Sequence, residues 1–310
     1  MVKSLANLLV KGAVGSDIGT SRYNNEDNYY LNGKIAEYTT DNQCSTAFHS
    51  PVTNGVFAVF DGMGGQSKGE FASLCASETI DQYKDSILKF GTKQIYKYVN
   101  DVNKKICDEM EKHSQRIGST LAVLTITEGI AQAYNLGDSS IYYISKNKIT
   151  KLTHDHTVAD QLYRMKALTA EEAKHDLRKH SLTKHLGMFA EENELRPFAS
   201  GNIRINNGDM FLLCTDGITN SVNENEIKRI IKTFDGRCKK TVNALIEKAI
   251  ENGSQDNLTA MVLRIVNSTN SNTLKRQLSR HPRLYPFLLG VGISTLIFVS
   301  IITVMLSKFA

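Results

Sequence analysis

Two kinds of hydrophobic pattern alternate between residues 1 and 266. Six short runs are rich in β-branched and aromatic residues, which is typical of strands: Gly55 to Phe60, Thr120 to Thr127, Ile130 to Leu136, Ile141 to Ser145, Met210 to Cys214 and Leu258 to Val266. Turn residues at Glu128-Gly129 and Lys146-Asn147 separate neighbouring runs. Because such short turns join antiparallel strands, the pattern predicts hairpins.

Longer stretches repeat their apolar positions with the period of a helix. They are Ser67 to Lys89, Thr92 to Lys112, Glu224 to Phe234 and Thr241 to Asn252. Gly253 supplies a stop for the last of them. The capping box Thr169-Ala-Glu-Glu172 predicts a further short helix.

The strand runs are apolar on both faces, so both faces need cover. Two antiparallel sheets packed together and flanked by helices meet that need better than a doubly wound parallel sheet, in which strands and helices alternate strictly. The pattern therefore predicts an α+β fold, a four-layer α-β-β-α sandwich, over residues 1–266.

The clearest change in composition lies near the end of the chain. Leu284 to Leu306 is 23 residues long and carries no charge. As a helix it would be roughly 34 Å long, enough for a bilayer core of about 30 Å. A buried core helix is the alternative, but it would need apolar cover on every side. The stretch 284–306 therefore predicts one C-terminal transmembrane helix.

Residues 267–283 form a linker that is first polar and then basic. Four basic residues of this linker precede the span, namely Lys275, Arg276, Arg280 and Arg283. Only one basic residue, Lys308, follows the span. By the positive-inside rule this asymmetry places the preceding domain in the cytoplasm. The expected localisation is a single-pass membrane protein with a cytoplasmic domain.

The net charge of +5 gives no indication of a nucleic-acid partner once it is located. The five basic residues from Lys275 onward account for all of it, so residues 1–274 are neutral. A neutral domain with a basic tail argues against a DNA-binding face.

The composition, with 21 Gly, 4 Pro and 41% hydrophobic residues, also excludes collagen-like and disordered chains. The five cysteines include no C-x-x-C pair that would suggest a zinc site or a disulfide framework.

Acidic residues recur at the ends of the predicted strands. Asp61, Asp138 and Asp216 each follow a strand run, Asp256 precedes one, and Glu26-Asp27 lies in a polar stretch near the N-terminus. One such residue is most often a turn former or a helix cap. Several carboxylates that converge repel one another, so they need cations between them, and oxygen ligands favour Mg²⁺ or Mn²⁺ over zinc.

Glycines directly after Asp61 allow the backbone to turn sharply, so that a main-chain carbonyl can also face a metal ion. They are Gly62, Gly64 and Gly65, with Met63 between them. The segment lacks the Gly-Lys-Ser/Thr of a phosphate-binding loop, and the chain lacks the spacing of a calcium-binding EF-hand.

Taken together, these motifs resemble the metal-dependent Ser/Thr protein phosphatases of type 2C, in a bacterial form. The resemblance runs from about Gly12 to Val266 and is carried, in family order, by Asp17 to Asp27, Val59 to Gly65, Gly118 to Thr120, Asn135 to Ser139, Thr215 to Gly217 and Gln255 to Thr259. Six short motifs in this order are far more specific than any one of them.

The resemblance implies two Mn²⁺ or Mg²⁺ ions between the sheets. Asp61 would bridge them, Glu26 and the Gly62 carbonyl would hold one, and Asp216 with Asp256 the other. Asp138 with Asp216 would form a weaker third site. Asp27 would order metal-bound water, with Asn257 beside it behind the ligands, and Arg22 would grip the phosphate.

The same resemblance implies the reaction. A hydroxide that bridges the ions would attack phosphoserine or phosphothreonine in line, without a phosphoenzyme intermediate. Met63 stands where many eukaryotic members have His, which leaves metal-bound water as the proton source. The segment from about Thr153 to Leu186 corresponds to the family's flap, so we interpret His154, Asp155, His156 and Asp160 as its beginning and not as a zinc site.

Two alternatives stay open at this point. A tail-anchored pseudophosphatase would bind phosphoproteins or a kinase without hydrolysis, but all four main carboxylate ligands are present. A small-molecule phosphatase with the same metal core would need only a phosphate monoester. The expected partners are phosphorylated proteins and a cognate Ser/Thr kinase, with the membrane contacted by the C-terminal helix and no nucleic acid.

Overall fold

The computed structural model describes residues 8–37, 44–64, 68–146, 148–189 and 195–268. The chain divides into two units, Met1–Val266 and Asn267–Ala310, and the following account concerns the first. Within the described ranges no helix has both the length and the apolar character needed to cross a bilayer. The predicted transmembrane helix, 284–306, and nearly all of the linker lie outside these ranges.

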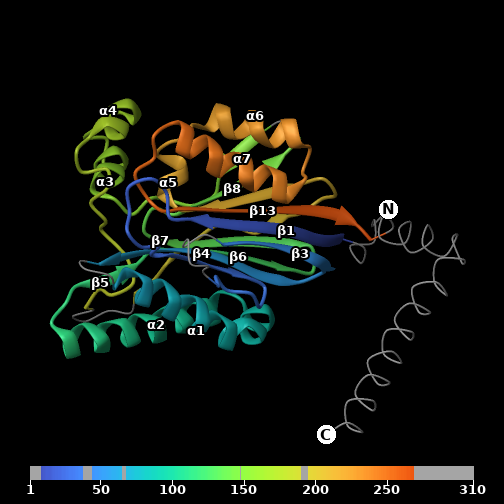
Figure 1. The fold of residues 1–310 in the computed structure, drawn as a ribbon. Coiled ribbons are helices and arrows are strands. Elements are labelled where there is room, and N and C mark those ends of the chain that lie inside the picture. The colour runs from blue at the N-terminus through green and yellow to red at the C-terminus, as the bar shows by residue number, and fades with distance from the viewer. Residues whose placement is uncertain (1–7, 38–43, 65–67, 147, 190–194, 269–310) are drawn as a thin grey trace, which may run out of the picture. The chain divides into compact units, whose positions relative to one another are not determined.

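Two antiparallel sheets form the centre of the domain (Figure 1). The first has six strands in the order β3-β1-β13-β12-β8-β9. Their bounds are β1 Leu8–Asp17, β3 Cys44–Val52, β8 Ser140–Ser145, β9 Lys148–Lys151, β12 Met210–Cys214 and β13 Leu258–Asn267.

The second sheet follows the order β10-β7-β6-β4-β2, with β5 added to β4 and β11 to β7. Its strands are β2 Asp27–Leu31, β4 Gly55–Gly64, β5 Ile117–Ser119, β6 Leu121–Thr127, β7 Ile130–Leu136, β10 Phe198–Ala199 and β11 Ile203–Arg204. Glu128 and Gly129 both have positive φ, 51° and 78°, as a tight hairpin between β6 and β7 requires.

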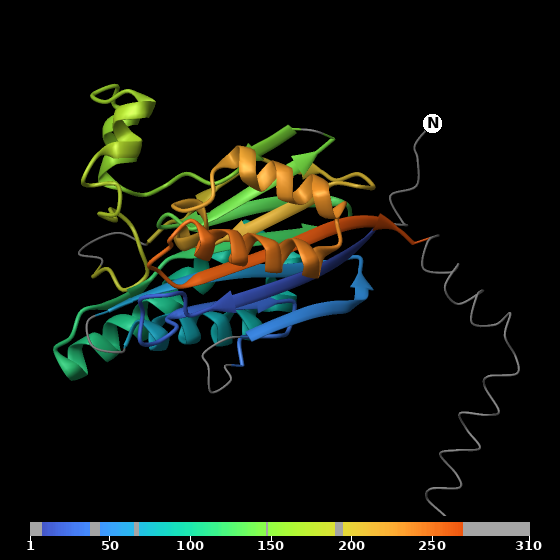
Figure 2. The ribbon, with the colours of Figure 1, turned by 45° about the horizontal axis from the view of Figure 1, so that its top comes forward.

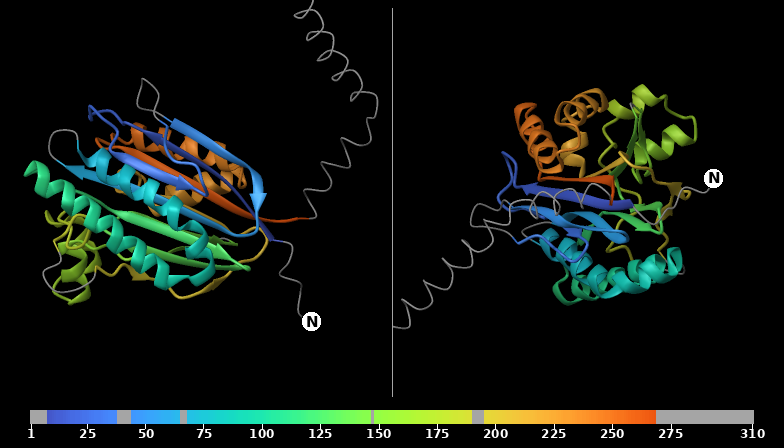
Figure 3. Two further views of the ribbon diagram at one scale, coloured as in Figure 1. Left: turned by 90° about the horizontal axis from the view of Figure 1, so that it is seen from below. Right: turned by 90° about the vertical axis from the view of Figure 1, so that its right-hand side faces the viewer.

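Helices cover the outer face of each sheet, and the layers are clearest from the side (Figure 3). The helices α1 Gly69–Phe90 and α2 Thr92–His113 pack on the second sheet, while α6 Glu224–Phe234 and α7 Cys238–Glu251 cover the first. A third apolar cluster, which includes Leu31, Phe57 and Leu263, fills the space between the sheets. The predicted α+β sandwich of two antiparallel sheets flanked by helices is confirmed.

The predicted elements are found with small shifts at their ends. Helix α7 begins three residues before the predicted Thr241, and α1 begins at Gly69, two residues after the predicted Ser67. Of the strands with five or more residues, β1, β2 and β3 were not predicted from the sequence. In β1, Gly12 and Gly15 interrupt the apolar run, and the Gly12 Cα lies where an added Cβ would come within 2.5 Å of Leu263. Glycine there leaves room for the Leu263 side chain of the neighbouring strand β13, so the residue that weakens the strand signal is needed for packing.

The segment predicted as a flap lies beyond one end of the sheets (Figure 2). It contains two short helices, α3 Val158–Arg164 and α4 Ala170–His175, and the predicted capping box of Thr169 and Glu172 begins the second. Isolated bridges between Thr157 and Leu182 and between Ser119 and Leu186 close its base. The flap is therefore a loop held at its base against the strand ends.

Candidate metal centre

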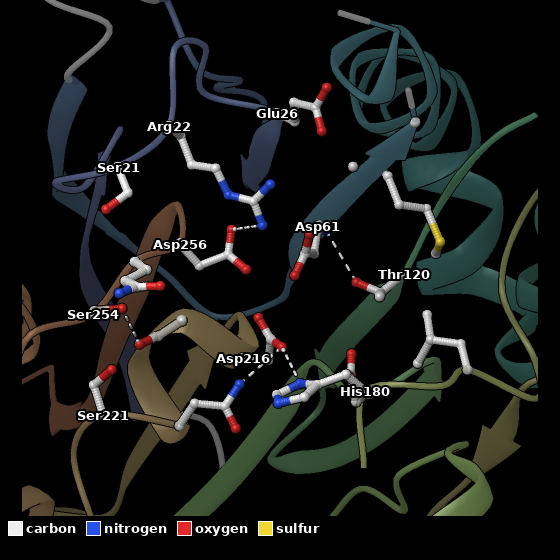
Figure 4. Close-up of a pocket in the computed structure, with 18 of the residues that line it drawn as sticks. Ser21, Arg22, Glu26, Asp61, Thr120, His180, Asp216, Ser221, Ser254 and Asp256 are labelled. Carbon is white, nitrogen blue, oxygen red and sulfur yellow. Dashed lines mark hydrogen bonds and ion pairs between the residues drawn. The ribbon is translucent and has the colours of Figure 1, made fainter. Parts of the chain in front are cut away.

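A cavity of about 880 Å³ opens at the end of the sheets nearest the flap. The close-up shows Arg22, Asp61, Asp216 and Asp256 facing the same space (Figure 4). The predicted site residues that line this cavity are Arg22, Glu26, Asp61, Gly62, Asp138, Asp216 and Asp256. Residues separated by more than 200 positions thus meet because five different segments, the β1–β2 loop, β4, the β7–β8 loop, α5 and the α7–β13 loop, come together at one place.

The pairing of β2 with β4 brings the N-terminal acids to Asp61. Asp27 is directly opposite Asp61 in the register of these two strands. Glu26 precedes β2, and its carbonyl accepts a hydrogen bond from the Gly62 amide at 3.1 Å and one from the Ser73 hydroxyl at 2.6 Å. The backbone of Glu26 is therefore held against β4 and α1, although Glu26 lies in a loop.

Glycine at position 62 is required by this close approach. A Cβ added to Gly62 would lie 2.3 Å from the Gly69 carbonyl oxygen and 2.4 Å from that of Glu26. Both distances are far below any real contact, so a larger residue would push the loop and the start of α1 apart. The glycines after Asp61 thus allow three backbone segments to meet beside the carboxylates.

Asn257 joins the C-terminal part of the site to the N-terminal part. Its side-chain oxygen accepts the Glu26 amide at 2.9 Å, while its side-chain nitrogen donates to the Ile18 and Asn24 carbonyls at 2.9 and 3.0 Å. The neighbouring Asp256 accepts the Asn257 amide at 2.9 Å. One amide side chain therefore fixes the loop that carries Glu26 relative to Asp256.

Asp61 and Asp138 are supported by a shared hydroxyl chain. Thr120 accepts the Asp61 amide at 3.0 Å, and its own amide donates to the Asp61 carbonyl at 2.9 Å. The Thr120 hydroxyl is also 2.6 Å from that of Ser139, which follows Asp138. The ends of β4, β6 and β7 are thereby linked just behind the two carboxylates.

The donor set suits a hard divalent cation. Burial, followed by the neighbouring carboxylates, raises the pKa of Asp61 well above its usual range, and the same causes raise the pKa of Asp138 to about 8 and that of Asp27 to about 7. One oxygen each of Asp27 and Asp216 is buried without a hydrogen-bond partner among the described residues. A divalent cation and the water bound to it would favour the charged forms of these carboxylates and would give both unpaired oxygens a partner.

Two basic side chains lie against the predicted ligands. The Arg22 guanidinium is 2.8 Å from Asp256, and Nδ1 of His180 is 3.7 Å from Asp216. In the arrangement that the structure describes, no three His, Cys, Asp or Glu side chains surround one point closely enough to hold an ion. Rotation of Arg22 and His180 away from their carboxylates would release both acids for an ion.

His180 and His185 line the cavity but were not singled out from the sequence. Both come from the flap, and His180 is exposed although it contacts Asp216. The Asp216 carboxylate raises the pKa of the His180 imidazole. The only signal in the sequence was the position of both residues within the predicted flap, since neither belongs to a short catalytic motif.

The side chains of the His154 to Asp160 segment, interpreted as the beginning of the flap, contact other residues and not one another. His154 stacks on Phe198, with ring centroids 3.9 Å apart, and the His156 ring accepts the Gly137 amide at 3.2 Å. Asp155 is paired with Lys151 at 2.6 Å. Each side chain thus has its own partner.

Comparisons with known proteins agree with this geometry. Residues 38–262 match the profile of the family described as Protein phosphatase 2C. The serine/threonine phosphatase stp of Listeria welshimeri is 31% identical over 255 residues, which cover 80% of this chain and 93% of the relative. The protein phosphatase PhpP of Streptococcus pneumoniae is 28% identical over 258 residues, with 80% and 94% covered.

Solved structures show the same fold. The serine/threonine phosphatase PstP/Ppp of Mycobacterium tuberculosis superposes with a TM-score of 0.68 at 25% identity, covering 83% of this chain and 98% of its own. A catalytic domain of PstP in complex with two manganese ions gives a TM-score of 0.66 at 26% identity, covering 84% and 99%.

Proposed function

Since the chain belongs to the protein phosphatase 2C family and is a metal-dependent Ser/Thr protein phosphatase, we propose that its acidic cavity binds two Mn²⁺ or Mg²⁺ ions. The observation that carries this proposal is the convergence of Glu26, Asp61, Asp216 and Asp256 on one cavity. Because none of these four carboxylate ligands is missing, an active enzyme is favoured over a pseudophosphatase. A relative solved with two manganese ions supports the number of ions.

Each residue has a specific task in this proposal. Asp61 would contribute to both ions, Glu26 and the Gly62 carbonyl would hold one, and Asp216 with Asp256 would hold the other. Asp138 with Asp216 would hold a weaker third ion. When bound, the ions lower the pKa of coordinated water and offset the charge on the phosphoryl oxygens.

The residues behind the ligands keep them in place. Asp27 is buried, and one of its carboxylate oxygens accepts the Thr215 hydroxyl at 2.8 Å, while the other has no hydrogen-bond partner among the described residues and is free to accept one from metal-bound water. The Asn257 side chain holds the Glu26 loop in place through three hydrogen bonds of 2.9 to 3.0 Å. These contacts orient water and ligands without contacting phosphate.

The substrate class can be tested directly by measuring release of inorganic phosphate. Purified protein with Mn²⁺ is expected to hydrolyse phosphothreonine and phosphoserine peptides, with a higher kcat/KM than for a free phosphorylated amino acid, because a peptide would also contact the flap and the cavity rim. Equal kcat/KM values for peptide and free amino acid would favour the small-molecule phosphatase. No release from any ester would favour the pseudophosphatase.

Replacing Arg22 by alanine is expected to raise KM for a phosphopeptide about tenfold, with a smaller effect on kcat. A guanidinium-phosphate hydrogen bond is worth about 1.5 to 3 kcal/mol, but Arg22 is half exposed and the metal ions also hold the phosphate. Arg22→Lys keeps the positive charge but cannot form the bidentate hydrogen bonds of a guanidinium group, so an intermediate KM is expected. Unchanged kinetics in Arg22→Ala would remove this residue from phosphate binding.

The membrane anchor is the second part of the proposal, and it rests on the uncharged stretch 284–306. Full-length protein should sediment with membranes and resist carbonate extraction, whereas a chain that ends at Thr273 should be soluble and should hydrolyse peptides at an unchanged rate. The anchor raises the effective concentration of the enzyme near a membrane-bound kinase and its substrates. Full-length protein recovered without detergent would contradict the anchor, and digestion of the domain by protease outside intact cells would contradict its cytoplasmic side.

A further inference from the structure

Exposed basic side chains gather at the end of the domain opposite the acidic cavity. We call this surface the basic end and define it by six exposed residues: Lys146, Lys148, Arg204, Arg237, Lys239 and Lys240. They come from three separate parts of the chain, the β8–β9 turn, strand β11 and the start of α7. Their common position is therefore a product of the fold.

Strand register places the β8–β9 turn beside the end of β13. Met210 pairs with Arg264 on one side and with Ile144 on the other, and the next residue of β8, Ser145, pairs with Lys148. Arg264 is three residues before Asn267, where β13 ends. The register thus places Lys146 and Lys148 at the end of the sheet where β13 ends. In Figure 1 this end of β13 lies on the side of the domain away from α3 and α4.

Contacts place the start of α7 at the same end. Arg264 pairs with Asp235 at 3.9 Å, and the Cys238 sulfur is 3.9 Å from the Lys11 carbonyl oxygen near the beginning of β1. Arg237, Lys239 and Lys240 therefore lie close to the last residues of β13.

Strand β11 also reaches this end. The Ile205 amide donates to the Gly129 carbonyl at 3.0 Å, and the Gly208 amide donates to Ile265 at 2.9 Å. Arg204 is thereby held next to the same part of β13.

The positive charge of this end is poorly balanced by acids. Among the described loops that form it, the acids are Glu128, Asp235 and Asp209; Asp235 is paired with Arg264, while Asp209 is buried and accepts the Tyr143 and Ser145 hydroxyls. Residues 1–274 carry no net charge as a whole, with 32 basic and 32 acidic residues once the five tail positives are set aside. The domain is thus polarised, with carboxylates at the cavity and basic side chains at the chain exit.

We propose that the basic end is the face that the domain presents to an anionic lipid surface, an inference that rests on the proposed membrane anchor. The sequence after the exit supplies the reason for this occupant. The linker 267–283 has 17 residues and can extend at most about 60 Å before the uncharged stretch begins. Its own four basic residues would lie near the same lipid headgroups.

This orientation has a consequence for the enzyme. With the basic end toward the lipid, the acidic cavity at the other end of the sheets faces away from the membrane. Phosphorylated segments that extend into the cytoplasm can then reach the flap, and the negative cavity is kept away from negative lipid headgroups.

Vesicle binding by the chain that ends at Thr273 tests the proposal without the apolar stretch. The described domain has its own core, and the matching catalytic domain of PstP was solved alone; unchanged peptide hydrolysis verifies folding of every variant. Binding is expected to vesicles of phosphatidylcholine with phosphatidylglycerol, to be weak without phosphatidylglycerol, and to fall as salt is raised.

The variant Lys239→Glu with Lys240→Glu should weaken partitioning at least about tenfold, since each basic residue near an anionic surface contributes measurably to binding. The matched control is Lys104→Glu with Lys112→Glu, which changes net charge equally on exposed positions of α2 and should bind like the parent. Equal weakening in both pairs, or no binding to anionic vesicles, would overturn the proposal. Binding to nucleic acid as tight as to these vesicles, and equally lost in the first pair, would overturn it in favour of a general polyanion site.

The outcome is separable from that of the anchor. If the full chain sediments with membranes but the truncated domain ignores vesicles, the anchor stands and the basic end fails. If the full chain is soluble yet the truncated domain binds vesicles, the anchor fails and the basic end stands as an electrostatic membrane contact.

Discussion

Replacing Asp61 by asparagine is expected to lower kcat about a thousandfold or more on a phosphothreonine peptide. Asp61 is the one carboxylate proposed to lie between both ions, and the charge stabilisation that the ions supply is worth several kcal/mol in the transition state. Asparagine keeps the size of the side chain but removes its charge. The measurement is phosphate release with saturating Mn²⁺, together with Mn²⁺ binding by calorimetry.

A second readout separates a lost ligand from a damaged fold. In chelator, Asp61→Asn should be more stable to heat than the parent. Burial and the neighbouring carboxylates raise the pKa of Asp61, so at neutral pH the folded chain must either bury this charge among like charges or take up a proton, and asparagine avoids both costs. A gain of about 1 kcal/mol corresponds to roughly 2 to 4 °C in Tm. The exposed Asp85→Asn on α1 is the control and should match the parent in rate and Tm. A near-normal rate in Asp61→Asn would show that the site is assigned wrongly.

Removal of divalent ions should abolish hydrolysis and also destabilise the domain. The proposed ligands come from segments that are distant in the chain, since Glu26 precedes β2, Asp61 lies in β4, Asp216 begins the short helix α5 Asp216–Thr219 and Asp256 precedes β13. An ion that binds the folded state and not the unfolded chain raises the free energy of unfolding in proportion to the logarithm of its concentration. Dialysis against EDTA should therefore lower both activity and Tm.

Addition of Mn²⁺ or Mg²⁺ should restore both quantities, with Tm rising as the ion concentration increases. Asp61→Asn should show a much smaller rise in Tm on addition of Mn²⁺, because one ligand common to both ions is lost. Activity that survives exhaustive chelation would rule out the proposed chemistry. Restored activity without any change in Tm would indicate that the ion is bound by the substrate and not by these carboxylates.

Much of this molecule could be predicted from local patterns. Runs such as Gly55 to Phe60 and Met210 to Cys214 became strands, because β-branched and aromatic residues in short runs between turns suit a buried sheet. The acids at the strand ends were found in the same way, since a polar residue after an apolar run marks the place where the chain leaves the core. Asp61, Asp138, Asp216 and Asp256 all line the cavity.

Other features depended on contacts between distant segments. His180 had no recognisable motif, and it reaches Asp216 only because the flap is closed at its base by the pairing of Thr157 with Leu182. Strand β1 contains glycines that weaken its local preference, and its place in the sheet depends on close packing of Gly12 against Leu263.

The residue types that carry the chemistry were thus decided locally, because the ability to supply an oxygen ligand is a property of the carboxylate side chain and an apolar run must be buried. Their arrangement was decided by the fold. The opposition of Asp27 to Asp61 follows from strand register, and the three hydrogen bonds of the Asn257 side chain join positions more than 200 residues apart. Likewise, the basic end exists only because β8, β11 and α7 turn at the same end of the sheets. In the chain its residues form two short basic runs, Lys146 to Lys148 and Arg237 to Lys240, with Arg204 between them, and only the fold brings these separate runs to one surface.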